Sequence, residues 1–355
     1  MAKRILMKGN EAIAEAAIQG GCQYFFGYPI TPQNEIPEYM SRELPKRGGT
    51  FLQAEAEFAA INMVYGAAAC GARVMTSSSG PGISLKAEGI SYLACAQLPC
   101  VIVNIMRGGP GLGDIAPAQQ DYLQAVKGIG HGDFKMPVLA PASIQEACDL
   151  MLEAFDLADI YTNPVMLLGD GMIGQMMEPV EFKKPAPRPL PEKDWALTGK
   201  ANHGGVRRMI TSADIDPKVL EARNLVLAAK YREIEEKEIK FEEYKTEGAE
   251  LIFVAYGTMS RIVKNTIKML EGMDIRAGLI RPITLWPFPK EAIHARAQEA
   301  QVKAVMAVEM SLGQMVEDVQ IATSGAKPVY FHGKAAGVIP QPREIIADVK
   351  KILGK

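Results

Sequence analysis

Helix-forming segments and short β-rich runs alternate along residues 1 to about 175, and this alternation limits the chain to a small set of folds. The pattern predicts helices over residues 10–19, 54–69, 83–96, 118–126 and 143–158. It predicts strands over residues 22–27, 50–53, 73–77, 101–106, 137–140 and 164–168. Strands that alternate with helices form a parallel sheet with helices on both faces. We therefore predict a doubly wound α/β unit.

The character of the chain changes after residue 178. Residues 178–191 are rich in Pro and Lys, and Pro cannot continue a helix or a central strand. Residues 216–247 carry dense mixed charge with an intermittent apolar stripe, which predicts a long exposed helix. A second α/β pattern starts at residue 251. We predict a first domain at 1–178, a linker with a long helix at 179–247, and a second domain at 248–355.

Composition excludes several functional classes. The chain has 355 residues, 48% of them hydrophobic, which is enough for a substantial core. Lys and Arg number 39 against 41 Asp and Glu, so we expect no attraction to nucleic acid or to an anionic membrane. No apolar run has the length of a signal peptide or a membrane span, and we expect a cytoplasmic protein. The five cysteines lack C-x-x-C spacing, which argues against a zinc or iron–sulfur site in this chain.

Three glycine patterns were compared with nucleotide and cofactor motifs. The run at residues 108–113 follows a predicted strand but has no G-x-G-x-x-G frame, and no P-loop motif occurs. Gly169-Asp170-Gly171 matches the start of a thiamine diphosphate metal motif, which needs an Asn about thirty residues later to complete Mg²⁺ coordination. The chain instead runs into the Pro-rich segment. We interpret residues 169–171 as a turn and predict no metal site here.

Two positions follow predicted strands and can present polar groups at the sheet edge. Thr31 lies in the segment 27–32 (GYPITP), where flanking prolines restrict the backbone on both sides of its hydroxyl. Arg107 ends the predicted strand 101–106, so it should emerge at the carboxyl edge of the sheet, where open α/β folds bind ligands. Its planar guanidinium suits a substrate carboxylate. A surface ion pair is the alternative role for Arg107.

Glu57 begins an Ala-rich helical segment and is the strongest candidate for an acid in a buried site. Burying a carboxylate without a partner is costly, so a basic group should meet it. A ring nitrogen of a bound heterocycle would serve, sharing a proton with the carboxyl group. Glu55 points to another face and is the weaker candidate. A Glu that only favours the helix dipole remains an equally good interpretation of Glu57.

Four motifs together resemble one enzyme family: residues 8–12 (KGNEA), 27–32 (GYPITP), 79–82 (SGPG) and 280–289 (IRPITLWPFP). The chain resembles, over nearly its whole length, the α subunit of the 2-oxoacid:ferredoxin oxidoreductases, which use thiamine diphosphate. Residues 60–69, 80–86 and 107–113 look most like the branched-chain members, which act on 3-methyl-2-oxobutanoate with coenzyme A. A 2-oxoglutarate or pyruvate enzyme of the same family is the first alternative.

The resemblance implies a fold and roles for single residues. The first domain would be a thiamine diphosphate pyrimidine-binding domain, and the second would be similar to the C-terminal domain of transketolase. Glu57 matches the acid that bonds N1′ of the aminopyrimidine and favours its imino tautomer. Thr31 and Arg107 match positions that hold the oxoacid carboxylate. Pro29 and Ile30 would line the cofactor.

The resemblance also implies partners. The diphosphate and its Mg²⁺ would lie on a separate β subunit, and the iron–sulfur clusters on other partners among γ and ferredoxin-like δ subunits. Ferredoxin would take the electrons, so this chain alone should be inactive. Two rivals from other classes are a non-catalytic assembly subunit, for which Thr31, Glu57 and Arg107 would have no use, and a dinucleotide enzyme, which would bind NAD.

Overall fold

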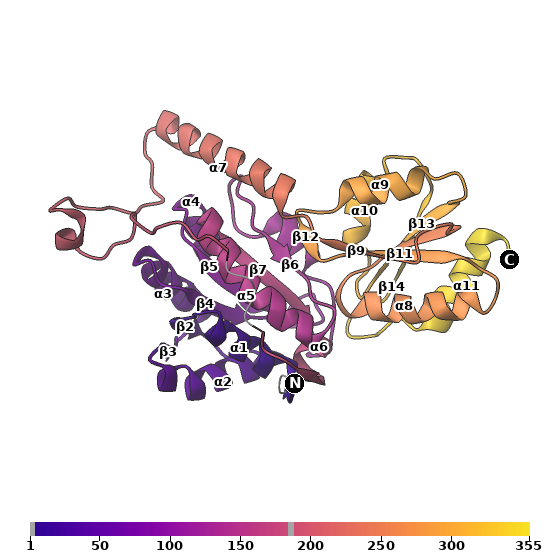
Figure 1. Ribbon diagram of the computed structural model, residues 1–355, viewed down its shortest axis with the longest axis horizontal. Helices are drawn as coiled ribbons and strands as arrows, with labels where there is room; N and C mark the ends of the chain where they lie inside the picture. The colour runs from indigo at the N-terminus through magenta and orange to yellow at the C-terminus, as the bar shows by residue number, and fades with distance from the viewer. Residues whose placement is uncertain (1–3, 184–187) are drawn as a thin grey trace.

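A computed structural model describes residues 4–183 and 188–355 as two α/β units (Figure 1). Residues 1–3 and residues 184–187 of the predicted linker lie outside the described residues. The long helix α7, Pro217–Lys237, runs along the first unit and leads towards the second (Figure 1). In the described part of the chain no helix is both long and apolar enough to cross a membrane.

The first unit is built on a seven-stranded sheet with the strand order β12-β6-β7-β5-β4-β2-β3. All neighbours pair in parallel except β12, which is antiparallel to β6. The strands are β2 (Tyr24–Gly27), β3 (Thr50–Gln53), β4 (Val74–Ser78), β5 (Cys100–Met106), β6 (Val138–Leu139), β7 (Pro164–Asp170) and β12 (Thr284–Trp286). The helices that pack in pairs against this sheet are α3 (Glu57–Ala69) with α4 (Gly80–Cys95), and α1 (Gly9–Gln19) with α5 (Ile144–Tyr161). The predicted doubly wound unit is confirmed.

The second unit has a five-stranded sheet with the order β14-β13-β10-β11-β9, in which only the edge strand β9 is antiparallel. Its strands are β9 (Phe241–Tyr244), β10 (Leu251–Val254), β11 (Ala277–Pro282), β13 (Ala304–Glu309) and β14 (Val329–Gly333). Its helices pack as α8 (Gly257–Glu271) with α11 (Pro342–Leu353), and α9 (Lys290–Gln298) with α10 (Met315–Thr323). The smaller elements are β1 (Ile5–Lys8), paired with β8 (Met177–Val180), and the helices α2 (Glu35–Glu43) and α6 (Gly171–Gln175).

The helix predicted over residues 118–126 starts too early. In the structure residues 118–121 precede the helical segment, which begins at residue 122 and continues as a π-helical turn at Gln124–Gly128. Gln119 is held outside this helix, because its backbone N–H donates to Met310 O over 2.8 Å. Its side chain donates to Tyr256 O and accepts from Met310 N. Contacts with the second unit therefore override the local helical pattern.

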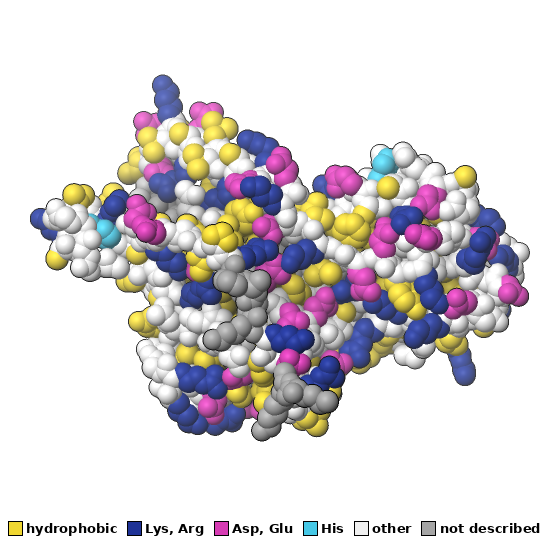
Figure 2. Space-filling view, in the orientation of Figure 1, with side chains coloured by type: hydrophobic (Ala, Val, Ile, Leu, Met, Phe, Trp, Pro, Cys, Tyr) yellow, Lys and Arg dark blue, Asp and Glu magenta, His cyan; other side chains and the backbone are white. Residues whose placement is uncertain are grey.

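The helix predicted to run from residue 216 to 247 ends at Lys237. Residues 241–244 instead form β9 at the edge of the second sheet, so part of the segment that we assigned to the linker belongs to that sheet. Glu242 and Glu243 of β9 pair with cations of the second unit, which stabilises the strand. Figure 2 shows hydrophobic side chains among charged ones over α7. The exposed hydrophobic residues of α7 include Val219, Leu225 and Val226.

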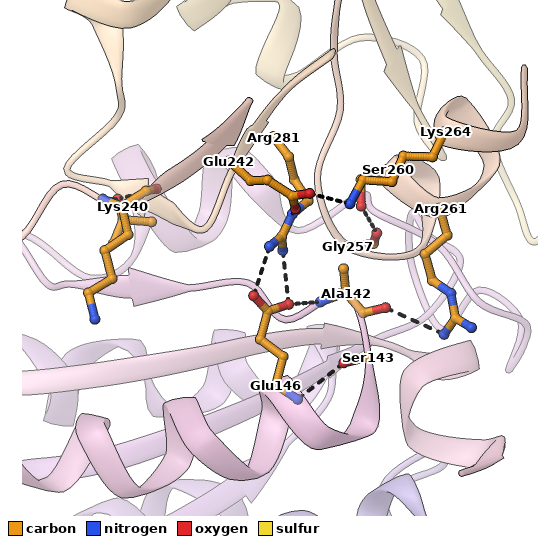
Figure 3. A network of polar contacts seen from close by, with 11 residues as sticks. Ala142, Ser143, Glu146, Lys240, Glu242, Gly257, Ser260, Arg261, Lys264 and Arg281 are labelled. Atoms are coloured by element: carbon orange, nitrogen blue, oxygen red, sulfur yellow. Dashed lines mark hydrogen bonds and ion pairs between the residues drawn. The ribbon is translucent and has the colours of Figure 1, made fainter. Parts of the chain in front are cut away.

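The motif at residues 280–289 connects the two units. Its strand β12 leaves the second unit and pairs with β6 of the first sheet. Arg281, in β11, is only 6% exposed and donates two hydrogen bonds, of 2.9 and 2.8 Å, to the Glu146 carboxylate on α5 (Figure 3). Its Nε donates to Glu242 over 2.7 Å. One guanidinium therefore holds carboxylates from both units.

Replacing Arg281 with Met should lower the free energy of unfolding by about 2–3 kcal/mol, because Glu146 and Glu242 would lose the cation between them. Both carboxylates keep some contact with water, which places the cost near the lower end for a buried pair. Urea unfolding of the chain measures the change. Lys303→Met, which breaks the exposed pair with Glu250, is the control and should cost under about 1 kcal/mol. Equal losses in the two variants would contradict the bridging role of Arg281.

Candidate active site

A crevice is expected at one end of the first sheet, where the direction of strand addition reverses. From β2, the chain adds β3 on one side, and β4 then returns to the other side of β2. Ligands of open α/β sheets bind at the carboxyl ends of the strands at such a point. The segments that follow β2 and β4 lie here, and they carry the sequence-predicted loop 27–32 and the start of α4.

The loop with Thr31 is fixed by hydrogen bonds to its backbone. Asn10 Nδ2 and Gln175 Nε2 both donate to Pro32 O, over 2.7 and 2.8 Å. Gln33 is fully buried, donates to Tyr28 O and accepts from Ser77 Oγ on β4. The loop is therefore attached to α1, α6 and β4. On its outer side Pro29 is exposed and Ile30 is half-buried.

Arg107 lies beside Thr31, as the sequence predicted for residues at one sheet edge. Its Nη1 donates to Thr31 O over 3.0 Å, and its Nη2 donates to Leu112 O over 2.8 Å. The Nε atom is buried and has no hydrogen-bond partner in the described part of the chain. Arg107 lines a cavity of about 260 Å³, whose other charged wall residue is Asp121. The cavity wall therefore carries one cation and one acid.

Glu57 is the first residue of α3, and its side chain is only 6% exposed. A Cβ added at Gly82 of α4 would lie 2.6 Å from Glu57 Oε1 and 2.1 Å from Ser78 Oγ, so both oxygens lie close to this glycine. Among the described residues, no donor hydrogen-bonds to the Glu57 carboxylate, and Glu57 does not line the Arg107 cavity. The structure thus joins Thr31 with Arg107 and places Glu57 in a separate, adjoining position beside Gly82.

Two charged residues near the crevice were missed by sequence reasoning. Lys86 of α4 is fully buried, and burial lowers its pKa to about 8 against the opposite effect of the Glu57 charge. Burial also raises the pKa of Asp121 to about 6, against the opposite effects of Asn104, the Gly80 N–H and the Arg107 charge. The sequence feature that could have indicated Lys86 is its spacing of one helical turn from Gly82, which places both residues on one helix face. Asp121 lies in the turn before residue 122, which the sequence pattern placed inside a helix.

The interpretation of residues 169–171 as a turn is wrong. Gly169 and Asp170 end β7, and Gly171 begins α6 with Asp170 as its N-cap. The Asp170 carboxylate is buried and accepts hydrogen bonds from Met172 N, Ile173 N and the hydroxyl and backbone N–H of Thr258. Both carboxylate oxygens of Asp170 therefore already accept hydrogen bonds from protein groups. No group of three or more potential metal-ligating side chains occurs within residues 4–183 and 188–355.

The site fits one half of the cofactor that the sequence motifs imply. Buried polar atoms without partners at the crevice are Ser78 Oγ, Ser79 Oγ and Arg107 Nε, and the Glu57 carboxylate is free to bond a ring nitrogen. These groups suit a polar heterocycle and a carboxylate. A diphosphate with Mg²⁺ needs several oxygen ligands, and the described residues offer no cluster of acids for them. The described residues therefore offer groups that suit an aminopyrimidine and a carboxylate.

Comparison with known families gives two matches. Residues 15–244 match the family described as "Pyruvate flavodoxin/ferredoxin oxidoreductase, thiamine diP-bdg". Residues 249–345 match "Pyruvate:ferredoxin oxidoreductase core domain II". The two matched ranges together include the crevice and Arg281, which bonds carboxylates of both units.

Individual relatives cover nearly the whole chain. It is 48% identical, over 98% of both chains, to the ketoisovalerate oxidoreductase subunit VorB of Methanothermobacter thermautotrophicus. It is 35% identical to the 2-oxoglutarate synthase subunit KorA of Methanocaldococcus jannaschii, over 96% of this chain and 97% of that one.

Solved structures show the same architecture. The 2-oxoglutarate:ferredoxin oxidoreductase from Magnetococcus marinus, with 2-oxoglutarate, coenzyme A and succinyl-CoA bound, matches with a TM-score of 0.86 and 25% identity. The match covers 99% of this chain, which spans 66% of that one. An inactive tetramer of a split-gene transketolase matches with a TM-score of 0.61 at 17% identity, over 98% of both chains, which shows a shared fold alone.

Proposed function

Because this chain belongs to the thiamine-diphosphate-dependent 2-oxoacid:ferredoxin oxidoreductases, we propose that it is the α subunit that binds the pyrimidine half of the cofactor and the carboxylate of a 2-oxoacid. The family resemblance drawn from the sequence motifs is confirmed. The observation that carries the proposal is the placement of two charged groups near one edge of the sheet. Glu57 is buried and its carboxylate accepts no hydrogen bond from the described residues, and Arg107, which bonds Thr31 O, has an Nε without a partner among them.

Each side chain has a defined task in this proposal. When bound, thiamine diphosphate supplies the carbon nucleophile that adds to the oxo carbon and takes up the electron pair left by carbon dioxide. Glu57 shares a proton with the ring nitrogen N1′ and holds the ring in the crevice. Arg107 and Thr31 bind the oxoacid carboxylate and orient it. Pro29 and Ile30 form an apolar wall next to the ring.

The proposal includes partner subunits that complete the site. Apolar side chains next to the crevice are exposed in this chain: Phe58 on α3, Leu85 on α4, and Leu112 and Ile115 in the loop after β5. Leu112 is 83% exposed, and we infer that a partner subunit covers these apolar side chains in the complex. We assign to a β subunit the diphosphate and Mg²⁺, and to γ and ferredoxin-like δ subunits the iron–sulfur clusters that pass electrons to ferredoxin. The complex would work in the cytoplasm.

The proposed substrate is 3-methyl-2-oxobutanoate, which the complex would convert with coenzyme A to an acyl-CoA and carbon dioxide. The relative at 48% identity is named for ketoisovalerate, and it supports this choice over 2-oxoglutarate and pyruvate. The cavity supports it too, because Arg107 is the one cation among the described residues that line it. One cation pairs with one carboxylate, whereas 2-oxoglutarate carries two.

A turnover comparison tests the substrate. With the complete complex, kcat/KM for 3-methyl-2-oxobutanoate should exceed that for pyruvate by about tenfold or more, because the branched side chain buries additional apolar groups. The value for 2-oxoglutarate should be lower still, since its second carboxylate would be desolvated without a cation. Ferredoxin reduction followed by absorbance measures the rates. Higher efficiency with 2-oxoglutarate or pyruvate would reject the proposed substrate and leave the family assignment intact.

A further inference from the structure

Lys86 is a buried cation to which the proposed function gives no role. It lies on α4 between Gly82 and Gly89, and the spacing 82, 86, 89 places these three residues on one helix face. That face packs against α3, because a Cβ at Gly82 would meet Glu57 and a Cβ at Gly89 would lie 2.4 Å from Ile61 Cγ2. Lys86 is therefore enclosed at the α3–α4 interface, one turn along from the carboxylate of Glu57.

The bonding of Lys86 is incomplete for a buried ammonium. Its Nζ donates to Ser77 O over 3.2 Å, and this is its one hydrogen bond within the described residues, although an ammonium has three donors. Such a group is costly to bury unless an opposite charge compensates it. The charge of Glu57 acts on Lys86 and opposes the effect of burial on its pKa. The interface thus encloses one positive and one negative group.

We propose that Lys86 is a positioning residue whose ammonium is the counter-charge of the Glu57 carboxylate when that carboxylate bonds the pyrimidine nitrogen. This inference rests on the proposed function of Glu57. When the proton moves from the Glu57 carboxyl group to the ring nitrogen, the carboxylate formed is stabilised by Lys86. Lys86 does not touch the ring or the substrate in this proposal.

Other charged groups lie against α4 and must be separated from Lys86 in a titration. Asp121 is close to Gly80 at the N-terminal end of α4, with Arg107 across the cavity. Glu88 is exposed and accepts a hydrogen bond from Tyr92 on the outer side of the helix. Arg223 reaches Cys95 O at the C-terminal end. The pKa of Asp121, about 6, is well below the pKa of Lys86, about 8, so the two groups titrate in different ranges.

Calorimetric binding of thiamine diphosphate to the complete complex tests the inference. Lys86→Met should weaken binding about tenfold at neutral pH, because the Glu57 carboxylate would lose its counter-charge. In the unmodified complex the affinity should fall as the pH rises through about 8, where Lys86 loses its proton. Lys86→Met should lack this step. The double variant with Glu57→Gln should bind no more weakly than Glu57→Gln alone, because the charge that Lys86 compensates is gone.

Lys230 offers a matched control. Lys230 is partly buried, whereas Lys86 is fully buried, but burial lowers the pKa of Lys230 to about 8 as well, and its Nζ likewise donates to one backbone carbonyl, Thr162 O, over 3.2 Å. Lys230→Met should leave both the affinity and its pH dependence unchanged. If Lys86→Met behaves like Lys230→Met while Glu57→Gln weakens binding, Lys86 has only a structural role and the inference is wrong. If Glu57→Gln also leaves binding unchanged, the proposed role of Glu57 itself is wrong, and the inference about Lys86 is wrong with it.

Thermal unfolding of the chain separates positioning from folding. Met has nearly the length of Lys and carries no charge to desolvate, so Lys86→Met should unfold at the same or a higher temperature at neutral pH. Weaker cofactor binding in a variant of equal or greater stability would support the inference. A loss of binding that only follows a lowered unfolding midpoint would contradict it.

Discussion

Replacing Glu57 with Gln should lower kcat of the assembled complex by about 10²–10⁴-fold, the range for loss of a positioned acid or base. Gln has the size of Glu and can still hydrogen-bond, but it cannot give a proton to a ring nitrogen or carry the resulting charge. The burial of Glu57 makes the effect large, because water has little access to replace the carboxyl group. Steady-state reduction of ferredoxin at saturating oxoacid, coenzyme A and thiamine diphosphate measures kcat.

Glu55→Gln is the control for this substitution. Glu55 is exposed and lies just before α3, so the control makes the same chemical change two residues away without touching the crevice. It should keep nearly the full rate. Near-normal turnover of Glu57→Gln together with tight cofactor binding would show that Glu57 is an ordinary residue at a helix start. The non-catalytic assembly subunit would then become the better description of this chain.

The sequence best predicts those elements whose conformation depends on local residue pattern alone. The strand at residues 50–53 and the start of the Ala-rich helix near Glu57 follow from β-rich and helical patterns that agree with their surroundings. The GYPITP segment predicts a restricted loop after a strand, and the structure has that loop after β2. The parallel arrangement then brings Thr31 and Arg107 to one edge without further information.

Contacts between the two units could not be predicted from local pattern. Gln119 lies in a stretch with helical propensity, yet its hydrogen bonds to Met310 and Tyr256 hold it outside the helical segment that follows. Strand β12 pairs outside its own unit, and the residues near Glu242 leave a helical pattern to join a sheet. These partners are distant along the chain: Gln119 and Met310 are 191 residues apart, and Glu242 and Arg281 are 39 residues apart. A local pattern contains no information about them.

The electrostatics of the site also depend on tertiary packing. Lys86 reads in the sequence as a charged residue in an amphipathic helix, whose ordinary position is the exposed face. Its burial follows from the close approach of α3 and α4 at Gly82 and Gly89. Asp170 likewise matches the beginning of a metal motif, and only the donors of α6 and Thr258 show that its oxygens are already engaged. Residue types indicated the chemistry, whereas packing decided which groups are available.

Replacing Arg107 with Ala should raise KM for the oxoacid by about 100-fold, because truncating one partner of a buried charge pair costs roughly 2–5 kcal/mol. KM for coenzyme A should change little, since a lost carboxylate contact weakens one substrate only. The oxoacid KM of Arg107→Lys should lie between those of the unmodified complex and Arg107→Ala, because Lys keeps the charge and loses the planar arrangement of donors. Initial rates with each substrate varied in turn give both constants.

The same guanidinium also holds Thr31 O and Leu112 O, so the Ala variant removes two supports of the crevice as well as a charge. The two effects have different consequences. A loosened loop would disturb the cofactor and both substrates, whereas a missing cation would affect only the anionic oxoacid. Added guanidinium ion should therefore restore part of the oxoacid affinity of Arg107→Ala if the cation is what the substrate needs. Equal increases in both KM values, without such rescue, would assign Arg107 to the support of its loop and remove it from substrate binding.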